Sequence, residues 1–369
     1  MGKYSVKGSP AFDARIDADM ESIANAVYAS PFSKHWKALI LLGGYGRGEG
    51  SPLIGPDGEE HPFNDYDLVV VTNSLDPLLK RALKTMEQEL SEKLGLPVDL
   101  YPYHASALSK CEFSLLNYEM KYGHRVIRGD KKILEAMPAY PHDAIPLSEG
   151  TRLLMNRGKL LLDIKRRLAQ PEILTHEEKE RFLKFLFKVD LAFGDCALLL
   201  RKAYDLSYVV KRQRISEIDL SGLDDSRTFA SAYIQAIDFK ERTDFKALAG
   251  NSVHLRFMET IRRYEQFLLW YERRRLNRRF QSLEKYAHAF PALGREGAPL
   301  KNAGHNLRTF GSSALPHCFS HPRLRLYAAL PLLLTKHADR NEIRWLLHSP
   351  ESNPEQLCQA FYALQRRFS

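Results

Sequence analysis

Two aspartates separated by one residue are the pair in this chain whose types and spacing could do chemistry. Asp65 and Asp67 lie in residues 64–71, NDYDLVVV. Side chains alternate across a strand, so both carboxylates are expected on one face, with the apolar residues between them on the core face. Two carboxylates on one face repel each other unless a divalent cation lies between them. Oxygen-only ligands favour Mg²⁺, which keeps some waters and completes its shell with phosphate oxygens.

A glycine-rich segment precedes the aspartates. Residues 41–49 read LLGGYGRGE, an apolar strand that runs into a glycine turn. Bare backbone N–H groups at Gly43 and Gly44 could cradle phosphates, and Arg47 could neutralise their charge. Pairing of Arg47 with Glu49 is the alternative. The two segments together predict a site for a metal-bound nucleoside triphosphate.

A third carboxylate, Asp99, lies in residues 96–103, LPVDLYPY, which read as another short strand. In this order the three parts resemble the nucleotidyltransferase superfamily, which includes DNA polymerase β, CCA-adding enzymes and aminoglycoside nucleotidyltransferases. The glycine segment looks closest to the uridylyltransferases that modify the nitrogen-regulatory PII proteins. The resemblance covers about the first third of the chain. The spacer 51–62 departs from the family pattern, because it is longer than usual and rich in turn residues.

The resemblance implies transfer of a nucleoside monophosphate from a triphosphate to an acceptor hydroxyl, with release of pyrophosphate. Two Mg²⁺ ions, which Mn²⁺ could replace, would clamp the attacking and leaving oxygens. Asp65, Asp67 and Asp99 would then be the catalytic residues and metal ligands, with Asp67 bridging the ions and Asp99 on the acceptor side. Gly43, Gly44 and Arg47 would bind the nucleotide.

The resemblance leaves the nucleotide and the acceptor open. ATP is one candidate nucleotide, and RNA (including tRNA), a protein hydroxyl or a small molecule could be the acceptor. The competing hypothesis is a non-catalytic nucleotide- or RNA-binding protein on the same fold. The presence of all three acids argues against it.

The composition indicates a globular protein with more than one core. The 369 residues are 44% hydrophobic, which suits two or three domains. No stretch of about twenty uncharged apolar residues occurs, so no membrane span is expected. The first residues lack the apolar core of a signal peptide, and the four cysteines are scattered without metal-ligand spacing. These features predict a cytoplasmic protein with reduced thiols, and they leave its oligomeric state open.

The net charge of +9 favours polyanionic partners without identifying one. Its excess is concentrated in one helical stretch, 256–279, which contains Arg256, Arg262, Arg263, Arg273, Arg274, Arg275, Arg278 and Arg279. One interpretation is a solvated helix face with interleaved glutamates. The other is a groove that binds RNA, tRNA among the candidates.

The predicted elements define the fold class, an α/β (α+β) mixed sheet of the nucleotidyltransferase type followed by a mainly α-helical domain. Strands are expected at 36–42, 67–72 and 97–103, an extended segment at 123–130, and helices at 11–30, 76–94 and 106–122. The domains are expected at 1–140 (catalytic), 146–285 (helical bundle) and 286–369 (an irregular segment, 290–322, and helices packed on the bundle). Polar residues that interrupt the apolar pattern of the bundle indicate inter-helix hydrogen bonds or substrate contacts; they are Asn156, Arg157, Lys188, Asp190 and Asp195.

Overall fold

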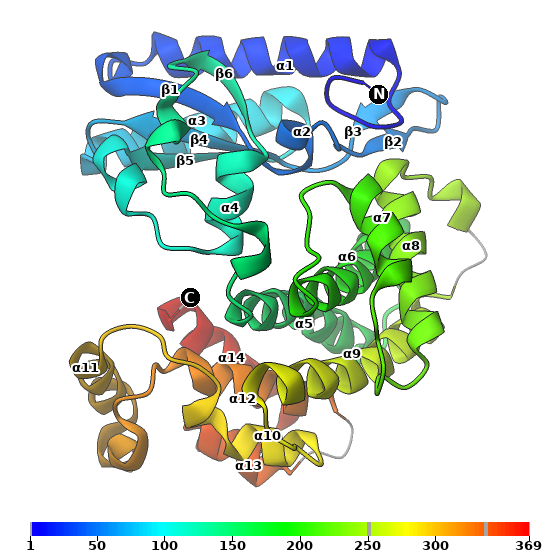
Figure 1. Ribbon diagram of the computed structural model, residues 1–369, viewed down its shortest axis with the longest axis vertical. Coiled ribbons are helices and arrows are strands. Elements are labelled where there is room, and N and C mark those ends of the chain that lie inside the picture. The colour runs from blue at the N-terminus through cyan, green and yellow to red at the C-terminus, as the bar shows by residue number, and fades with distance from the viewer. Residues whose placement is uncertain (1, 249–251, 336–338, 369) are drawn as a thin grey trace. The chain divides into compact units, whose positions relative to one another are not determined.

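The computed structural model describes residues 2–248, 252–335 and 339–368. The chain divides into two compact units (Figure 1). The sheet unit comprises Met1–Pro146, Arg201–Ile218 and Ser231–Gly250, and the helical unit comprises Leu147–Leu200, Asp219–Ala230 and Asn251–Ser369. This division differs from the three consecutive domains expected, because two segments beyond residue 200 belong with the N-terminal part of the chain.

A four-stranded mixed sheet forms the centre of the sheet unit, as the sequence predicts. Its strands are β1 (Trp36–Leu41), β4 (Tyr66–Thr72), β5 (Val98–His104) and β6 (Arg125–Gly129), in the order β5-β4-β1-β6. β4 and β5 run parallel, and β1 is antiparallel to β4 and β6. A parallel pair needs a crossover connection, which α3 (Pro77–Leu94) supplies.

One face of this sheet is core. α1 (Pro10–Ala29) and α3 cover it, and Figure 1 shows α1 lying along the strands. Leu68 and Val70 of β4 and Leu100 of β5 are buried there with Ile16 and Leu83 of the helices. Because side chains alternate along each strand, the residues between them point to the opposite face. That opposite face is where the aspartates lie.

Shorter elements complete the sheet unit. They are α2 (Gly43–Arg47), β2 (Pro52–Ile54), β3 (Glu60–Pro62), α4 (Leu115–Tyr122), α7 (Tyr208–Glu217), the C-terminal part of α8 (Ser226–Glu241), and the 3₁₀ helices η1 (Ser33–His35), η2 (Ala105–Lys110), η3 (Ile133–Ala136), η4 (His142–Ala144) and η5 (Lys246–Leu248). The long spacer forms the β2–β3 hairpin. The expected single helix over 106–122 is wrong: η2 ends at Lys110, and α4 starts afresh where the Ser114 side chain accepts from the Asn117 N–H.

The helical unit is built on α5 (Ser148–Leu168), α6 (His176–Leu200) and α9 (Val253–Leu276), which pack against one another. The remaining helices are α10 (Leu283–His288), η6 (Phe290–Ala292), α11 (Pro299–Phe310), η7 (Gly311–His317), α12 (Arg323–Leu334), α13 (Arg340–Leu347) and α14 (Pro354–Phe368). α12 packs on α5. The expectation of an irregular segment over 290–322 is wrong, because its prolines and glycines delimit helices: Pro299 begins α11 and Gly311 ends it.

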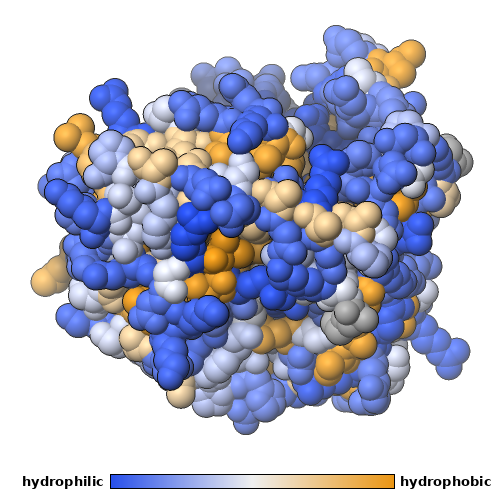
Figure 2. Space-filling view, turned by 90° about the horizontal axis from the view of Figure 1, so that it is seen from above, coloured by the Kyte–Doolittle hydropathy of each residue, from blue (hydrophilic) through white to orange (hydrophobic). Residues whose placement is uncertain are grey.

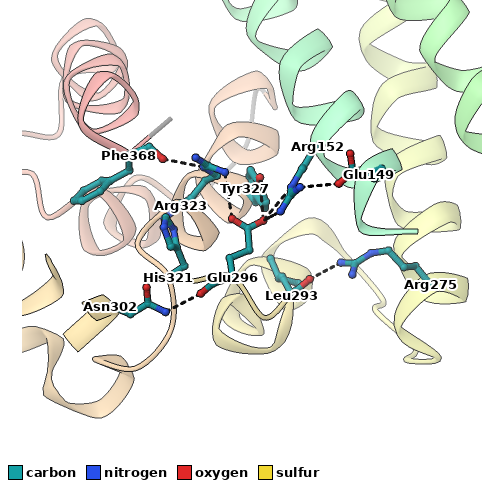
Figure 3. A network of polar contacts seen from close by, with 10 residues as sticks. All are labelled: Glu149, Arg152, Arg275, Leu293, Glu296, Asn302, His321, Arg323, Tyr327 and Phe368. Atoms are coloured by element: carbon teal, nitrogen blue, oxygen red, sulfur yellow. Dashed lines mark hydrogen bonds and ion pairs between the residues drawn. The ribbon is translucent and has the colours of Figure 1, made fainter. Parts of the chain in front are cut away.

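A buried carboxylate holds the connection between η6 and α11 in place (Figure 3). Glu296 Oε1 accepts from Arg152 Nε and Nη2 of α5, each at 3.3 Å, and Oε2 accepts from Arg323 Nη1 of α12, also at 3.3 Å. The Tyr327 hydroxyl donates to Oε1 at 3.4 Å. These contacts explain how a connection without regular structure is fixed between two packed helices.

Among residues 2–248, 252–335 and 339–368, no helix combines the length and the apolar character that a bilayer crossing needs. The face shown in Figure 2 is mostly hydrophilic, with hydrophobic residues in small groups.

Candidate active site

The structure brings the three predicted aspartates together. Asp67 is the second residue of β4 and lies beside Asp99 of β5 in the parallel register, and Asp65 immediately precedes β4. One carboxylate oxygen from each residue lies within 4.8 Å of those of the other two. Asp67 and Asp99 are exposed and Asp65 is partly buried, so the cluster opens to solvent.

The cluster concentrates negative charge. Burial raises the pKa of Asp99 above its ordinary value, and the neighbouring carboxylates of Asp65 and Glu87 raise it further. A hard divalent cation would relieve this repulsion, and the donor set consists of carboxylate oxygens only, with no thiolate or imidazole among them. That set suits Mg²⁺ or Mn²⁺.

Gly43 lies directly against Asp67. The glycine segment forms the short helix α2 rather than the expected turn, and Gly43 begins it with a φ of +64°. A Cβ at this position would lie 2.7 Å from Asp67 Oδ2. Both the left-handed backbone and the close approach therefore require glycine here.

Replacing Gly43 by alanine should weaken binding of a Mg²⁺-bound triphosphate by roughly tenfold or more, because the new methyl group must displace the Asp67 carboxylate. Isothermal titration calorimetry measures this loss. Gly58→Ala is the matched control: Gly58 has a φ of +86°, and a Cβ there meets nothing within 4 Å. Both variants should lose about 1–2 kcal/mol of stability from backbone strain. Equal binding by the two variants would contradict the role of Gly43.

A lysine that sequence reasoning missed lies beside Gly44. Lys240 Nζ of α8 donates to the Glu49 carbonyl at 2.6 Å, and a Cβ on Gly44 would lie 3.2 Å from it. Burial lowers the pKa of Lys240 to about 8, and the nearby charges of Arg47 and Lys211 act in the same direction. Nothing in the segment DFKER distinguishes this lysine in the sequence.

Arg47 contacts Glu119 rather than Glu49. Its Nη1 donates to Glu119 Oε2 at 3.0 Å, and the Tyr204 hydroxyl donates to Oε1 at 2.6 Å. Burial alone would raise the pKa of Glu119, but the charges of Arg47 and Lys211 outweigh it and hold that pKa below its ordinary value. Arg47 is therefore part of a fixed ion pair beside the glycines.

Glu49 is held by the segment that follows residue 200. Its Oε1 accepts from Ser207 Oγ and from the Tyr208 N–H, each at 2.8 Å. Lys211 Nζ of α7 lies 4.1 Å from the ring centre of Tyr204 and 4.2 Å from that of Tyr208. Segments distant in the sequence thus surround α2 with Lys211, Lys240 and the Arg47–Glu119 pair.

A pocket of about 450 Å³ adjoins the aspartates. It is lined by Leu42, Gly43, Asp67, Leu68, Val69, Glu87, Asp99, Tyr101, Tyr103, Leu116, Asn117, Glu119 and Met120. All of these belong to the sheet unit. Its volume lies within the ~300–1,000 Å³ range typical of small-molecule sites.

The arginine-rich stretch does not form a free basic groove. Arg256 and Arg263 pair with the buried Asp190, and Arg275 pairs with the buried Glu272. The guanidinium groups of Arg273 and Arg274 donate to backbone carbonyls of Phe280 and Ser221. These ion pairs and hydrogen bonds all lie within the helical unit and stabilise it.

Three arginines of the stretch are exposed: Arg262, Arg278 and Arg279. The other five arginines of the stretch are buried or partly buried, so the exposed basic surface is smaller than the sequence suggests. The pairing of Asp190 across α6 and α9 agrees with the interpretation that polar residues in the bundle make inter-helix hydrogen bonds.

Of the comparisons with family models, curated proteins and solved structures, the last gives a match. No protein-family model matches the chain, and no curated protein matches it. Among solved structures, the spectinomycin adenyltransferase AAD(9) from Enterococcus faecialis, in a structure with ATP and spectinomycin, matches at a TM-score of 0.39 and 12% identity, over 67% of this chain and 98% of that chain. A likeness at this level does not establish a shared fold, so function must be argued from this chain's own residues.

Proposed function

We propose that this chain is a metal-dependent nucleotidyltransferase, which moves a nucleoside monophosphate from a triphosphate to an acceptor hydroxyl. The observation that supports it is the convergence of Asp65, Asp67 and Asp99 within 4.8 Å, with Gly43 against Asp67. Carboxylates that only structured a strand end would not need a glycine with a left-handed backbone beside them.

The residues at and around the three aspartates would have two roles, metal binding and phosphate binding. Asp65, Asp67 and Asp99 would hold Mg²⁺, which when bound would neutralise the triphosphate oxygens and the departing pyrophosphate. Gly43 and Gly44 leave room for the phosphates, and Lys240, which lies beside Gly44, would offer them a positive charge. Arg47 supports this arrangement through its ion pair with Glu119.

The proposed reaction is a single displacement at phosphorus. The acceptor oxygen forms a bond to the α-phosphorus, and the bond from that phosphorus to the pyrophosphate oxygen breaks. The hydroxyl proton passes to Asp99, the aspartate assigned to the acceptor side.

The direct test is transfer of label. The protein is incubated with Mg²⁺ and each of the four ribonucleoside triphosphates in turn, labelled at the α-phosphorus, together with a cell extract. Release of unlabelled pyrophosphate with appearance of a labelled acceptor, both abolished by EDTA, supports the proposal. Nucleotide binding without release of pyrophosphate would favour the non-catalytic binding protein instead.

Nucleotide affinity should decrease as the pH rises through about 8, because Lys240 then loses the proton that attracts the phosphates. Between pH 7 and pH 9 the loss should be roughly tenfold. Lys240→Arg, which keeps its charge, should flatten this dependence, whereas the same change at the exposed Lys34 should not. Calorimetry with a non-hydrolysable triphosphate at both pH values measures the effect.

The titration of Lys240 does not destabilise the fold as the pH rises, so unfolding through this group cannot explain the expected decrease in nucleotide affinity. Its pKa in the folded protein lies below the ordinary value of 10.5, so the unfolded chain binds more protons between the two values. The contribution of Lys240 to the free energy of unfolding therefore rises with pH in this window. A pH profile unchanged in Lys240→Arg would remove Lys240 from the nucleotide site.

A further inference from the structure

The outer face of α11 in the helical unit is apolar. Leu300 is 82% exposed and Leu307 is 44% exposed. Residues three or four positions apart on a helix lie side by side, so Gly304 lies between the two leucines on the same face. Among the described residues, a Cβ added to Gly304 would meet nothing within 4 Å. Leu300, Gly304 and Leu307 form a surface open to solvent, here called the α11 face.

The buried face of the same helix is polar at its middle. Asn302 and Asn306 are 3% and 2% exposed. The Asn302 amide donates to the Glu296 carbonyl at 2.8 Å, as Figure 3 shows, and to the Phe319 carbonyl at 3.1 Å. The Asn306 amide donates to the Cys318 carbonyl at 2.8 Å. A helix at a protein surface ordinarily turns its apolar residues inward and its polar residues outward, and α11 does the reverse.

The two leucines are not what attaches α11 to the helical unit. Besides the asparagine amides, Phe310 at the end of the helix attaches it, because this ring packs with Ala314 and Phe368 in a small apolar cluster. Leu315 and Phe319, which follow α11, are also exposed, at 59% and 61%. Single exposed leucines are common, but exposed apolar side chains grouped on one segment indicate contact with another molecule.

Positive charge lies along one edge of the α11 face. Lys301 and Arg308 each follow one of the leucines, and both are exposed. The one acidic residue between positions 291 and 322 is Glu296, and its carboxylate is already shared by Arg152 and Arg323. No acid of this segment is therefore left for the two exposed cations. The surface is apolar with a basic edge, and its complement is apolar with an acidic edge.

We propose that the α11 face docks an acidic amphipathic helix of a protein partner. Gly304 leaves a gap between two leucines, which lets a second helix approach to the ~8–10 Å separation of packed helices. Apolar side chains of that helix would fill the gap, and its aspartates or glutamates would pair with Lys301 and Arg308. A second copy of this chain is a poor occupant, because its own α11 face would bring the same positive edge. The proposal does not rest on the nucleotidyltransferase function.

A matched set of helical peptides tests the charge and the apolar contact. The acidic peptide, of about 20 residues, has leucine and alanine along one face and glutamate beside them. The basic peptide has lysine in place of each glutamate, and the polar peptide keeps the glutamates but has serine in place of each leucine. Binding of each labelled peptide to the full chain is measured by fluorescence anisotropy at low salt. The acidic peptide should bind with a Kd on the order of 100 µM, and the other two at least roughly tenfold more weakly.

Gly304→Leu separates helix docking from general hydrophobic attraction. The fold should accept this change, because the new side chain points into open space and leucine favours a helix more than glycine does. A helix packed closely over Gly304 would be pushed away, so the acidic peptide should bind roughly tenfold more weakly. A surface that only attracts apolar groups would bind the same peptide more tightly.

Substitutions at the leucines and at the basic edge test the location. Leu300→Glu should weaken binding of the acidic peptide by roughly tenfold or more. Leu255→Glu is the matched control, because Leu255 of α9 lies in the same unit and is 65% exposed, and it should leave binding unchanged. Lys301→Glu combined with Arg308→Glu should reverse the preference between the acidic and the basic peptide. Each variant should melt like the wild type.

Several results would overturn the inference. One is no binding of the acidic peptide at about 1 mM, and another is binding by Gly304→Leu as tight as that of the wild type or tighter. Binding to vesicles of anionic phospholipid that Leu300→Glu abolishes would show that the α11 face contacts a membrane instead. Self-association in sedimentation that Leu300→Glu abolishes would show that a second copy of the chain occupies the face.

Discussion

Replacing Asp67 by asparagine should lower Mg²⁺-dependent turnover of the triphosphate by roughly 1,000-fold or more. Asp67 lies between Gly43 and Asp99, so its carboxylate is the one placed to contact both the phosphate side and the acceptor side. The side chain is exposed, and the amide has nearly the same shape. The fold should therefore remain intact. Release of pyrophosphate, measured against Mg²⁺ concentration, reports the loss.

The matched control for that variant is Asp143→Asn. Asp143 is an exposed aspartate of η4, outside the carboxylate cluster and outside the pocket lining. It should keep wild-type turnover and an unchanged thermal midpoint. Near-normal turnover by Asp67→Asn, in a protein that melts like the wild type, would show that the reaction takes place elsewhere.

Replacing Asp190 by asparagine should destabilise the helical unit by about 3–5 kcal/mol, because it removes the charge that compensates two arginines. Asp190 is fully buried on α6 and accepts from Arg263 at 2.9 Å and from Arg256 at 3.2 Å. Its loss leaves both guanidinium groups facing an amide. The thermal midpoint should drop on the order of 10 °C, as measured by calorimetry or circular dichroism.

Asp224→Asn provides the comparison for this effect. Asp224 is exposed in the same unit and should shift the midpoint by little. A small shift in Asp190→Asn would mean that Arg256 and Arg263 find other partners. The interpretation that arginines of the stretch 256–279 stabilise the helical unit through buried ion pairs would then be wrong.

The sequence was sufficient for features that depend on local pattern. Alternation along β4 and β5 placed Tyr66, Leu68 and Asp67 on their correct faces, and Asp76 with Pro77 marked the start of α3. The convergence of the three aspartates follows from the parallel register of the two strands. These signals lie within a few residues of the groups that they position.

Features that depend on segments far apart in the sequence could not be predicted from local patterns. Lys240 reaches the glycines from a helix almost two hundred positions later, and its neighbours in the sequence are those of any amphipathic helix. The roles of the arginines in α9 also depended on where Asp190 and Glu272 came to lie. Proline and glycine in 290–322 were misread, because a helix boundary and an irregular loop use the same residues.

The interleaving of the two units has a consequence for synthesis on the ribosome. Residues 1–146 emerge first, but they leave Glu49 without Ser207 and Glu119 without Tyr204. The Lys240 that lies beside Gly44 emerges almost a hundred residues later. During much of its translation the nascent sheet therefore lacks the hydrogen bonds that Ser207 and Tyr204 give to Glu49 and Glu119, and Arg47 is the partner that Glu119 already has.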